Sequence, residues 1–214
     1  MLNNLESEAT GHTPGSFWKP VGTRLRLASA SARRLMLLRQ VGLDPEVRPT
    51  NVDESRHADE HAVDYVRRMA LEKARAGVTG EVDLVLGADT AVVLEDEIMG
   101  KPRDQADAMS MLARLSGREH RVLTGVALCS PDRPGGRAVV VESRVRFKRL
   151  SDAEILAYVK SGEPFDKAGA YAIQGLGAAW VARVSGSYSG VVGLPLFETL
   201  ELLRDFGLTF SAPE

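Results

Sequence analysis

Two long strand-like segments joined by a short turn constrain the fold of this chain most. Residues 120–129 and 138–148 are rich in β-branched and other apolar residues, and the turn PDRPGG between them predicts an antiparallel hairpin. The start of the chain differs: RLRLA (24–28) alternates like a half-buried strand, and the residues after a Ser-rich turn have helical spacing up to Gly42. A chain that combines a strand–turn–helix unit with an antiparallel hairpin predicts an α/β fold, with a mixed central sheet flanked by helices.

Further elements alternate in the same way along the chain. The periodicity and end signals predict helices at 61–76, from the cap Asp104 to Gly117, from the capping box at Ser151 to about 161–162, and at 195–206. Strands are predicted at 82–88, 90–94, 171–175 (YAIQG) and 178–184 (AAWVARV).

Length, charge and cysteine content exclude several classes of protein. The 214 residues fit one domain, which we place at 21–214, after a polar extension at 1–20 that we expect to be flexible. A net charge of -2 argues against a general nucleic-acid binder. The single Cys129 excludes an internal disulfide and a multi-cysteine zinc site, and it favours a reducing, cytoplasmic location. Neither a membrane-spanning run nor a secretory signal is evident.

The segment SASARR (29–34) is a candidate phosphate site. It lies between a predicted strand and a helix N-terminus, where free backbone N–H groups favour anions. Ser29 can donate a hydrogen bond, and Arg33 and Arg34 can bind phosphate oxygens in a bidentate way. The segment lacks the glycines and lysine of a Walker loop. Taken alone, the segment fits an ordinary serine cap beside surface arginines better than a phosphate site.

Carboxylates and lysines form the remaining candidates. Asp89 follows an apolar strand, where a carboxylate can activate water, hold a metal or simply cap a turn. Glu54 lies in an acidic turn, and Lys101 lies between Gly100 and Pro102, which suits either a fixed ammonium or a plain turn. Lys73 falls on the apolar stripe of helix 61–76, so it either snorkels outward or points into a site. The histidines 57, 61 and 120 show no metal-binding spacing, and we interpret them as surface residues.

Taken together, these segments resemble the Maf family of nucleoside triphosphate pyrophosphatases. The resemblance covers about residues 24–207 and is carried by eight motifs, which are LASASARRLMLLRQVGL (27–43), VDES (52–55), YVRRMALEKA (65–74), VLGADTAVVL (85–94), GKP (100–102), LSGREHRVLTGVAL (115–128), DKAGAYAIQG (166–175) and GVVGLPL (190–196). One departure is visible: Ala32 stands where the family usually has Pro. Alanine is a good helix former, so we expect the helix start to survive.

The resemblance implies two lobes around a cleft, as in inosine triphosphatase-like folds, and an assembly that is often dimeric. It implies hydrolysis between the α and β phosphates of a nucleoside triphosphate with Mg²⁺ or Mn²⁺. By motif position, Ser29, Arg33, Arg34, Lys73 and Lys101 look like the polyphosphate-binding residues. Asp89 matches the proposed proton acceptor, and Glu54 looks like an acidic partner of metal or water, so the metal would lie at Glu54 and Asp89.

Within the family, Arg33, Thr90 and Gln174 match the subgroup that resembles dTTP/UTP pyrophosphatases, and the resemblance implies that these three residues bind the substrate. The expected role is therefore removal of uridine-type and other non-canonical pyrimidine nucleotides. Three alternatives remain at this point. They are a pyrophosphatase of the 7-methyl-GTP type, a nucleotide-binding regulator of septation without important catalysis, and an RNA-binding module, the last disfavoured by the lack of an aromatic-rich basic stripe.

Overall fold

The protein, described by a computed structural model over residues 23–208, is built on one seven-stranded mixed sheet. The strands follow the order β2-β1-β3-β5-β6-β7, and β4 pairs with β3 beyond the end of β1. The pairs β1·β2 and β1·β3 are parallel, and all other pairs are antiparallel. The mixed sheet and the hairpin predicted from the sequence are confirmed. The strands are β1 (Leu25–Leu27), β2 (Glu46–Val47), β3 (Leu84–Leu94), β4 (Glu97–Met99), β5 (Glu119–Cys129), β6 (Arg137–Phe147) and β7 (Val181–Ser185).

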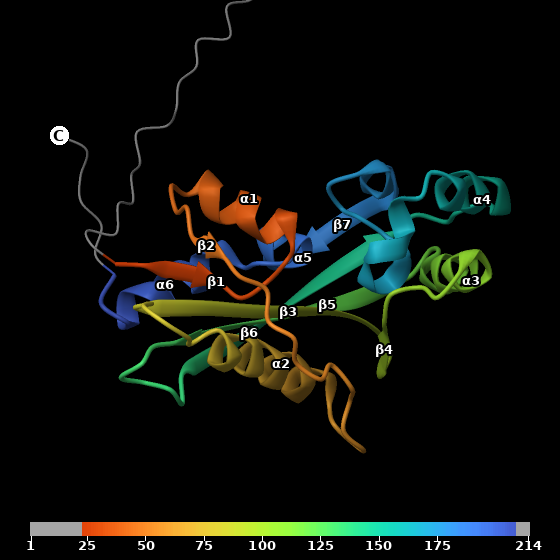
Figure 1. The fold of residues 1–214 in the computed structure, drawn as a ribbon. Coiled ribbons are helices and arrows are strands. Elements are labelled where there is room, and N and C mark those ends of the chain that lie inside the picture. Colours follow the sequence, from red (N-terminus) through yellow and green to blue (C-terminus); the bar gives the residue numbers. More distant parts are fainter. Residues whose placement is uncertain (1–22, 209–214) are drawn as a thin grey trace, which may run out of the picture.

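Helices cover both faces of this sheet (Figure 1). Helix α2 lies against one face, over β3 and β5, while α1, α5 and α6 lie on the other side, and α3 and α4 lie together at one end. The α-helices are α1 (Ala32–Gln40), α2 (Ala62–Ala76), α3 (Gln105–Leu115), α4 (Asp152–Lys160), α5 (Tyr188–Val192) and α6 (Leu196–Asp205). Three short 3₁₀ turns precede β7, namely η1 (Glu163–Asp166), η2 (Ala168–Ala170) and η3 (Leu176–Trp180).

Side-chain caps explain where three of the helices begin. The side chains of Ser31, Asp104 and Ser151 accept hydrogen bonds from backbone N–H groups three residues further along, as N-caps do. At Ser151 the bond is reciprocal, because Glu154 accepts from the Ser151 N–H and completes the predicted capping box. Helix α1 begins at Ala32, so the start does survive without proline.

Two strand predictions are wrong. Residues 82–88 and 90–94 do not form separate strands around Asp89, because β3 runs unbroken from Leu84 to Leu94 and pairs with β5 along nearly its whole length. YAIQG (171–175) is not a strand but a loop between η2 and η3, and only the second half of AAWVARV is extended, as β7. The extension predicted at 1–20 lies outside the described residues.

Two glycines let α2 approach the sheet closely. A Cβ on Gly87 of β3 would lie 2.2 Å from the backbone oxygen of Ala70, and one on Gly125 of β5 would lie 2.3 Å from that of Val66. These are backbone contacts, which cannot move aside as a flexible side chain can. The helix backbone therefore packs directly on the strands, and this contact fixes the distance between Lys73 and β3.

His120 contradicts its surface assignment. Its side chain lies in the core on β5, 2 % exposed, among the edges of Phe147 and Tyr171. The Nε2 atom is 2.8 Å from the Tyr171 hydroxyl, and burial lowers the pKa of His120 to about 4. His57 and His61 are exposed as expected, and Cys129 is buried in β5.

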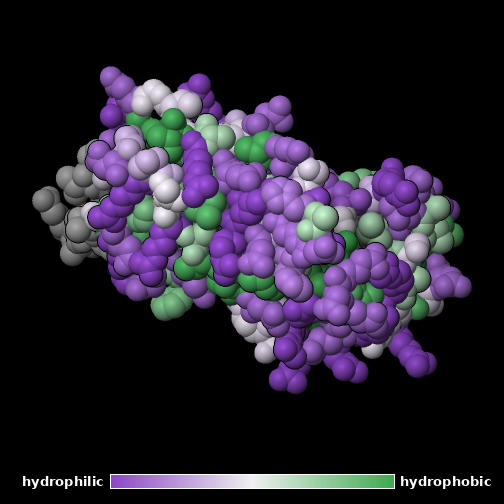
Figure 2. All heavy atoms as spheres, turned by 90° about the horizontal axis from the view of Figure 1, so that it is seen from below, coloured by the Kyte–Doolittle hydropathy of each residue, from purple (hydrophilic) through white to green (hydrophobic). Residues whose placement is uncertain are grey.

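The outer surface around α2 is mostly hydrophilic, and its hydrophobic residues form small separate groups (Figure 2). No helix within residues 23–208 is long and apolar enough to cross a bilayer.

Candidate active site

A gap along one edge of β3 creates the site. On this edge β1 pairs with residues 84–86 and β4 with residues 92–94, while β5 occupies the opposite edge. On this edge, no described strand pairs with the stretch between residues 86 and 92, which contains Asp89 and Thr90. Because β1 and β4 both end beside this gap, the segments that follow them, 29–34 and 100–102, lie there too. Chain topology thus brings together motifs that are about 70 residues apart in sequence.

The gap opens into a cleft of about 750 Å³. Every residue expected at the site from the sequence lines this cleft. They are Ser29, Arg33, Arg34, Glu54, Lys73, Asp89, Thr90, Lys101 and Gln174.

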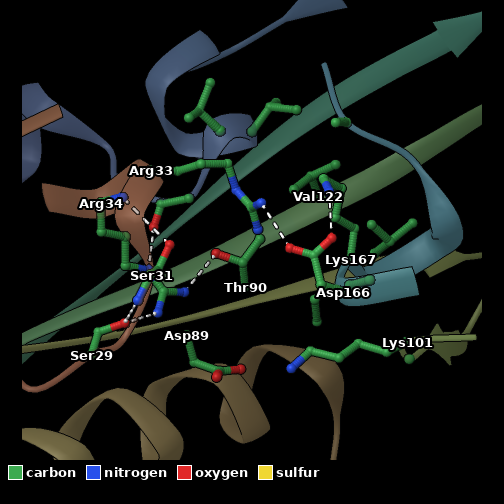
Figure 3. Close-up of a pocket in the computed structure, with 18 of the residues that line it drawn as sticks. Ser29, Ser31, Arg33, Arg34, Asp89, Thr90, Lys101, Val122, Asp166 and Lys167 are labelled. Atoms are coloured by element: carbon green, nitrogen blue, oxygen red, sulfur yellow. Dashed lines mark hydrogen bonds and ion pairs between the residues drawn. The ribbon is translucent and has the colours of Figure 1, made fainter. Parts of the chain in front are cut away.

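Alternation along β3 sends neighbouring side chains to opposite faces of the sheet. Asp89 points toward α2, and Thr90 points toward α1 and α5 (Figure 3). Lys73 of α2 meets Asp89 there, with its Nζ 2.7 Å from Asp89 Oδ1. Both side chains are close to nine-tenths buried, so the apolar-stripe position of Lys73 is explained by a cleft beneath it rather than by snorkelling. Asp89 therefore lies in the middle of a strand and not, as predicted, at its end.

Glu54 joins this pair from the loop before α2. Its Oε1 is also 2.7 Å from Lys73 Nζ, which places two carboxylates around one ammonium. The hydrogen bond from Lys73 lowers the pKa of Glu54, and the charges of Lys101 and Arg34 lower it further. Tyr65 holds the loop in place, because its hydroxyl donates to the Glu54 backbone oxygen at 3.1 Å, and burial raises the pKa of Tyr65 to about 12.

The donor set at Glu54 and Asp89 fits a hard divalent cation. Mg²⁺ usually takes one or two carboxylates and completes its shell with substrate phosphates and water. No group of three or more His, Cys, Asp or Glu side chains suited to a metal occurs within residues 23–208. A metal here would thus be held jointly by these two carboxylates and the phosphates of a substrate.

Arg34 is held rigidly at the cleft wall. Its Nε donates to Gly193 O at 2.9 Å, Nη1 to Ser29 Oγ at 3.0 Å and Nη2 to Thr90 Oγ1 at 3.3 Å. A guanidinium has five N–H groups, so two remain for a ligand. Burial lowers the pKa of Arg34, and the nearby Asp89 opposes this effect.

Thr124 decides the direction of the hydrogen bond at Thr90. The Thr124 hydroxyl donates its single proton to Gly190 O at 2.8 Å, so in its 3.1 Å contact with Thr90 it accepts. Thr90 therefore donates to Thr124 and accepts from Arg34. Its hydroxyl orients the guanidinium and has no proton left for a ligand.

The other arginines near the start of the chain separate into two groups. Arg33 faces the cleft and forms an ion pair with Asp166 at 3.3 Å, which joins α1 to the end of η1 (Figure 3). Arg24, Arg26 and Arg39 instead bind carboxylates and backbone oxygens outside the cleft. Of the five arginines between residues 24 and 39, only Arg33 and Arg34 therefore line the cleft.

Lys101 and Gln174 complete the cleft. Lys101 extends from the end of β4 toward Asp89 (Figure 3). Gln174 is an exposed residue of the loop between η2 and η3. Lys167 also lines the cleft and donates to Glu163 O at 2.8 Å.

A family model described as "Maf-like protein" matches residues 24–206, which include every residue of the cleft. The chain belongs to the Maf family. A curated Maf relative from Anaeromyxobacter sp. (strain Fw109-5), named dTTP/UTP pyrophosphatase, is 60 % identical over 89 % of this chain and 94 % of its own length. A protein of the same name from Hahella chejuensis is 50 % identical over 88 % and 95 % of the two chains. Among solved structures, a HAM1 protein from Coxiella burnetii aligns with a TM-score of 0.49 and 17 % identity, over 86 % of this chain and 99 % of that one.

Sequence reasoning missed three contributors to this Maf cleft, namely Tyr65, Thr124 and Lys167. Thr124 carried one signal, since it is the one polar residue in the apolar stretch VLTGVAL (122–128). Tyr65 and Lys167 lie inside quoted motifs, but nothing in the sequence indicates that they bind the backbone oxygens of Glu54 and Glu163, which are 11 and 4 residues away.

Proposed function

We propose that this protein hydrolyses dTTP and UTP between the α and β phosphates, giving a nucleoside monophosphate and pyrophosphate. The observation that carries the proposal is the cleft itself, in which fixed cations face two carboxylates within a Maf-family fold. The names of the close relatives support the same substrates.

The cations suit a polyphosphate. A triphosphate with one divalent metal still carries excess negative charge, and more charge develops on the pyrophosphate as it leaves. Arg34 offers two free N–H groups, and its position is already fixed by Ser29, Thr90 and Gly193. Lys101 approaches the same space from the opposite side. Because Arg34 is preorganised, it stabilises the developing charge with little rearrangement.

The carboxylates suit proton transfer from water. In this proposal Asp89 accepts the proton of the attacking water, and Lys73 orients Asp89 and Glu54 through its two 2.7 Å contacts. A bound Mg²⁺ or Mn²⁺ would neutralise phosphate charge and make a coordinated water more acidic. Serine, histidine and cysteine nucleophiles are not required.

Gln174 suits the edge of a uracil or thymine base. That edge has an N3–H donor flanked by carbonyl acceptors, and a glutamine amide offers one acceptor and two donors. Gln174 can therefore satisfy the N–H and one carbonyl together.

We propose the cytoplasm as the place of this reaction.

Product analysis tests the proposal. Purified protein is incubated with dTTP, UTP, GTP and 7-methyl-GTP in the presence of Mg²⁺ or Mn²⁺, and the products are separated by ion-exchange chromatography. We expect dTMP or UMP with pyrophosphate, and higher kcat/KM for dTTP and UTP than for guanine nucleotides. Orthophosphate as the first product would contradict the cleavage site, a preference for 7-methyl-GTP would favour the other Maf subgroup, and binding without turnover would favour a regulator.

A further inference from the structure

Glu163 is a partly buried carboxylate that the proposed chemistry does not use. It lies in η1, and within the described part of the chain it makes no ion pair. Instead it accepts three hydrogen bonds from uncharged donors. Its Oε2 accepts from the Leu176 N–H at 3.0 Å, and its Oε1 accepts from the Gly177 N–H at 3.3 Å and from the Tyr158 hydroxyl at 2.8 Å.

These bonds fasten both ends of the loop that carries Gln174. We call residues 171–175 the Gln174 loop. At its C-terminal end, the N–H groups of Leu176 and Gly177 bind Glu163 directly. At its N-terminal end, the Ala172 N–H donates to the Tyr158 hydroxyl at 3.0 Å, and that hydroxyl donates to Glu163. One carboxylate thus holds the chain on both sides of Gln174.

Gly175 shows how closely the loop is pressed onto this carboxylate. A Cβ at position 175 would lie 2.3 Å from each of the two Glu163 carboxylate oxygens. The loop backbone therefore fits over the carboxylate only where no side chain intervenes. This contact sets the distance between the loop backbone and Glu163, while the hydrogen bonds fix the two ends of the loop.

Glu163 is ionised in this position. Burial alone would raise the pKa of Glu163, but the hydrogen bonds from Leu176, Tyr158 and Gly177 and the charge of Lys167 together hold it below its ordinary value. Hydrogen bonds to an ionised acceptor are roughly twice as strong as those between neutral groups. Gln174, by contrast, is exposed on the cleft side of the loop, where its amide is open to a ligand.

We infer that Glu163 is a positioning residue for base selection: it fixes the Gln174 loop so that the Gln174 amide meets the edge of the base, without touching the nucleotide itself. This inference rests on the proposed function. It predicts that weakening the Glu163 contacts harms recognition of the base and spares recognition of the phosphates, which bind at Arg34 and Lys101 on other elements.

The substitution Glu163→Gln tests this. The amide keeps the size of the side chain but replaces one acceptor oxygen by a donor NH₂, so at least one loop N–H or the Tyr158 hydroxyl faces a donor. We expect kcat/KM for UTP to fall about 10-fold, mainly through KM, while kcat/KM for GTP changes less than about 3-fold. Competitive inhibition by pyrophosphate, which has no base, should be unchanged. Asp152→Asn is the matched control, because it also replaces a carboxylate by an amide, but at an exposed residue at the start of α4. It should leave all three measurements unchanged.

A double-mutant cycle separates positioning from general destabilisation. If Glu163 acts through Gln174, then Glu163→Gln added to Gln174→Ala should lower kcat/KM for UTP no further, because the positioned group is already gone. Tyr158→Phe removes the link to Ala172 and should shift the UTP/GTP ratio in the same direction, which keeps the test available if Glu163→Gln folds poorly.

The outcomes distinguish the two proposals. If the wild-type protein shows no preference for UTP over GTP, both the proposed function and this inference fall. If the wild-type preference is present but both loop variants keep the wild-type ratio, or if the double mutant is additive, only the role of Glu163 is overturned.

Discussion

At the scale of single residues, the site depends on groups whose freedom is limited by their neighbours. Lys73 is held between two carboxylates, and Arg34 is held by three acceptors from three segments. Thr90 illustrates the difference that the structure makes. Its place on the cleft wall agrees with the expected substrate-binding position, and the direction of its hydrogen bonds adds that it orients Arg34.

Asp89→Asn should abolish most turnover. The amide keeps the shape of the side chain and loses the ability to accept a proton, so we expect kcat to fall by about 10²-fold or more. Lys73 retains Glu54 as a partner, so thermal unfolding should show a folded protein. Asp96→Asn, on an exposed turn, is the control and should keep wild-type kcat. Near-normal turnover of the Asp89 variant would remove this residue from the chemistry.

Gln174→Glu should change the choice of base. A carboxylate only accepts hydrogen bonds, so it would face a uracil or thymine carbonyl with no proton between them. The guanine edge instead presents two adjacent donors. We expect kcat/KM for dTTP and UTP to fall by roughly 10–100-fold, with a smaller loss or a gain for GTP. Equal losses for all nucleotides in steady-state assays would mean that Gln174 does not read the base.

At the scale of elements, most of the fold could be predicted because its signals are local. The caps at Asp104 and Ser151 mark two helix starts correctly, since a cap depends only on residues three apart. Predictions fail where distant contacts decide. The long pairing with β5 carries β3 straight through Asp89, and the contacts with Glu163 hold YAIQG as a loop despite its apolar residues. The motif residues of the site were predictable, but the gap in the sheet edge that gathers them was not.

Gly87→Ala tests the contact between α2 and the sheet. The added Cβ would lie 2.2 Å from Ala70 O and 2.5 Å from Ala74 N, so α2 must shift away from β3. Overpacking of this kind typically costs about 1–3 kcal/mol of unfolding free energy. The shift also separates Lys73 from Asp89, so kcat should fall even under conditions where the variant is fully folded. Urea denaturation and steady-state assays measure the two effects.

Gly135→Ala provides the matched control for this substitution. Gly135 lies in the turn between β5 and β6, where an added Cβ meets nothing within 4 Å. Its unfolding free energy should stay within about 0.5 kcal/mol of wild type. Wild-type stability and kcat in Gly87→Ala would show that α2 has room to move without disturbing the site.

At the scale of the whole molecule, His120 should make stability depend on pH in mildly acidic solution. Its pKa is about 4 in the folded protein because burial disfavours the charged ring, whereas an unfolded histidine titrates near its ordinary value of 6.5. Between these values the unfolded chain binds a proton that the folded chain does not, so the free energy of unfolding falls as pH decreases. The contribution of neutral His120 to the free energy of unfolding is complete above pH 6.5. It is lost progressively toward pH 4, by up to about 3 kcal/mol over that window.

His120→Phe should reduce this dependence. The variant leaves the Tyr171 hydroxyl without its 2.8 Å partner, so it is expected to be less stable than wild type at neutral pH. That loss of stability involves uncharged groups and is the same at every pH. The slope of the free energy of unfolding against pH therefore reports only the protonation of His120. Urea denaturation at intervals from pH 6.5 to 4.5 should give a clearly shallower slope for His120→Phe. His61→Gln, which alters an exposed histidine, should keep the wild-type slope. Parallel slopes for wild type and His120→Phe would mean that His120 takes up its proton in the folded protein as readily as in the unfolded chain.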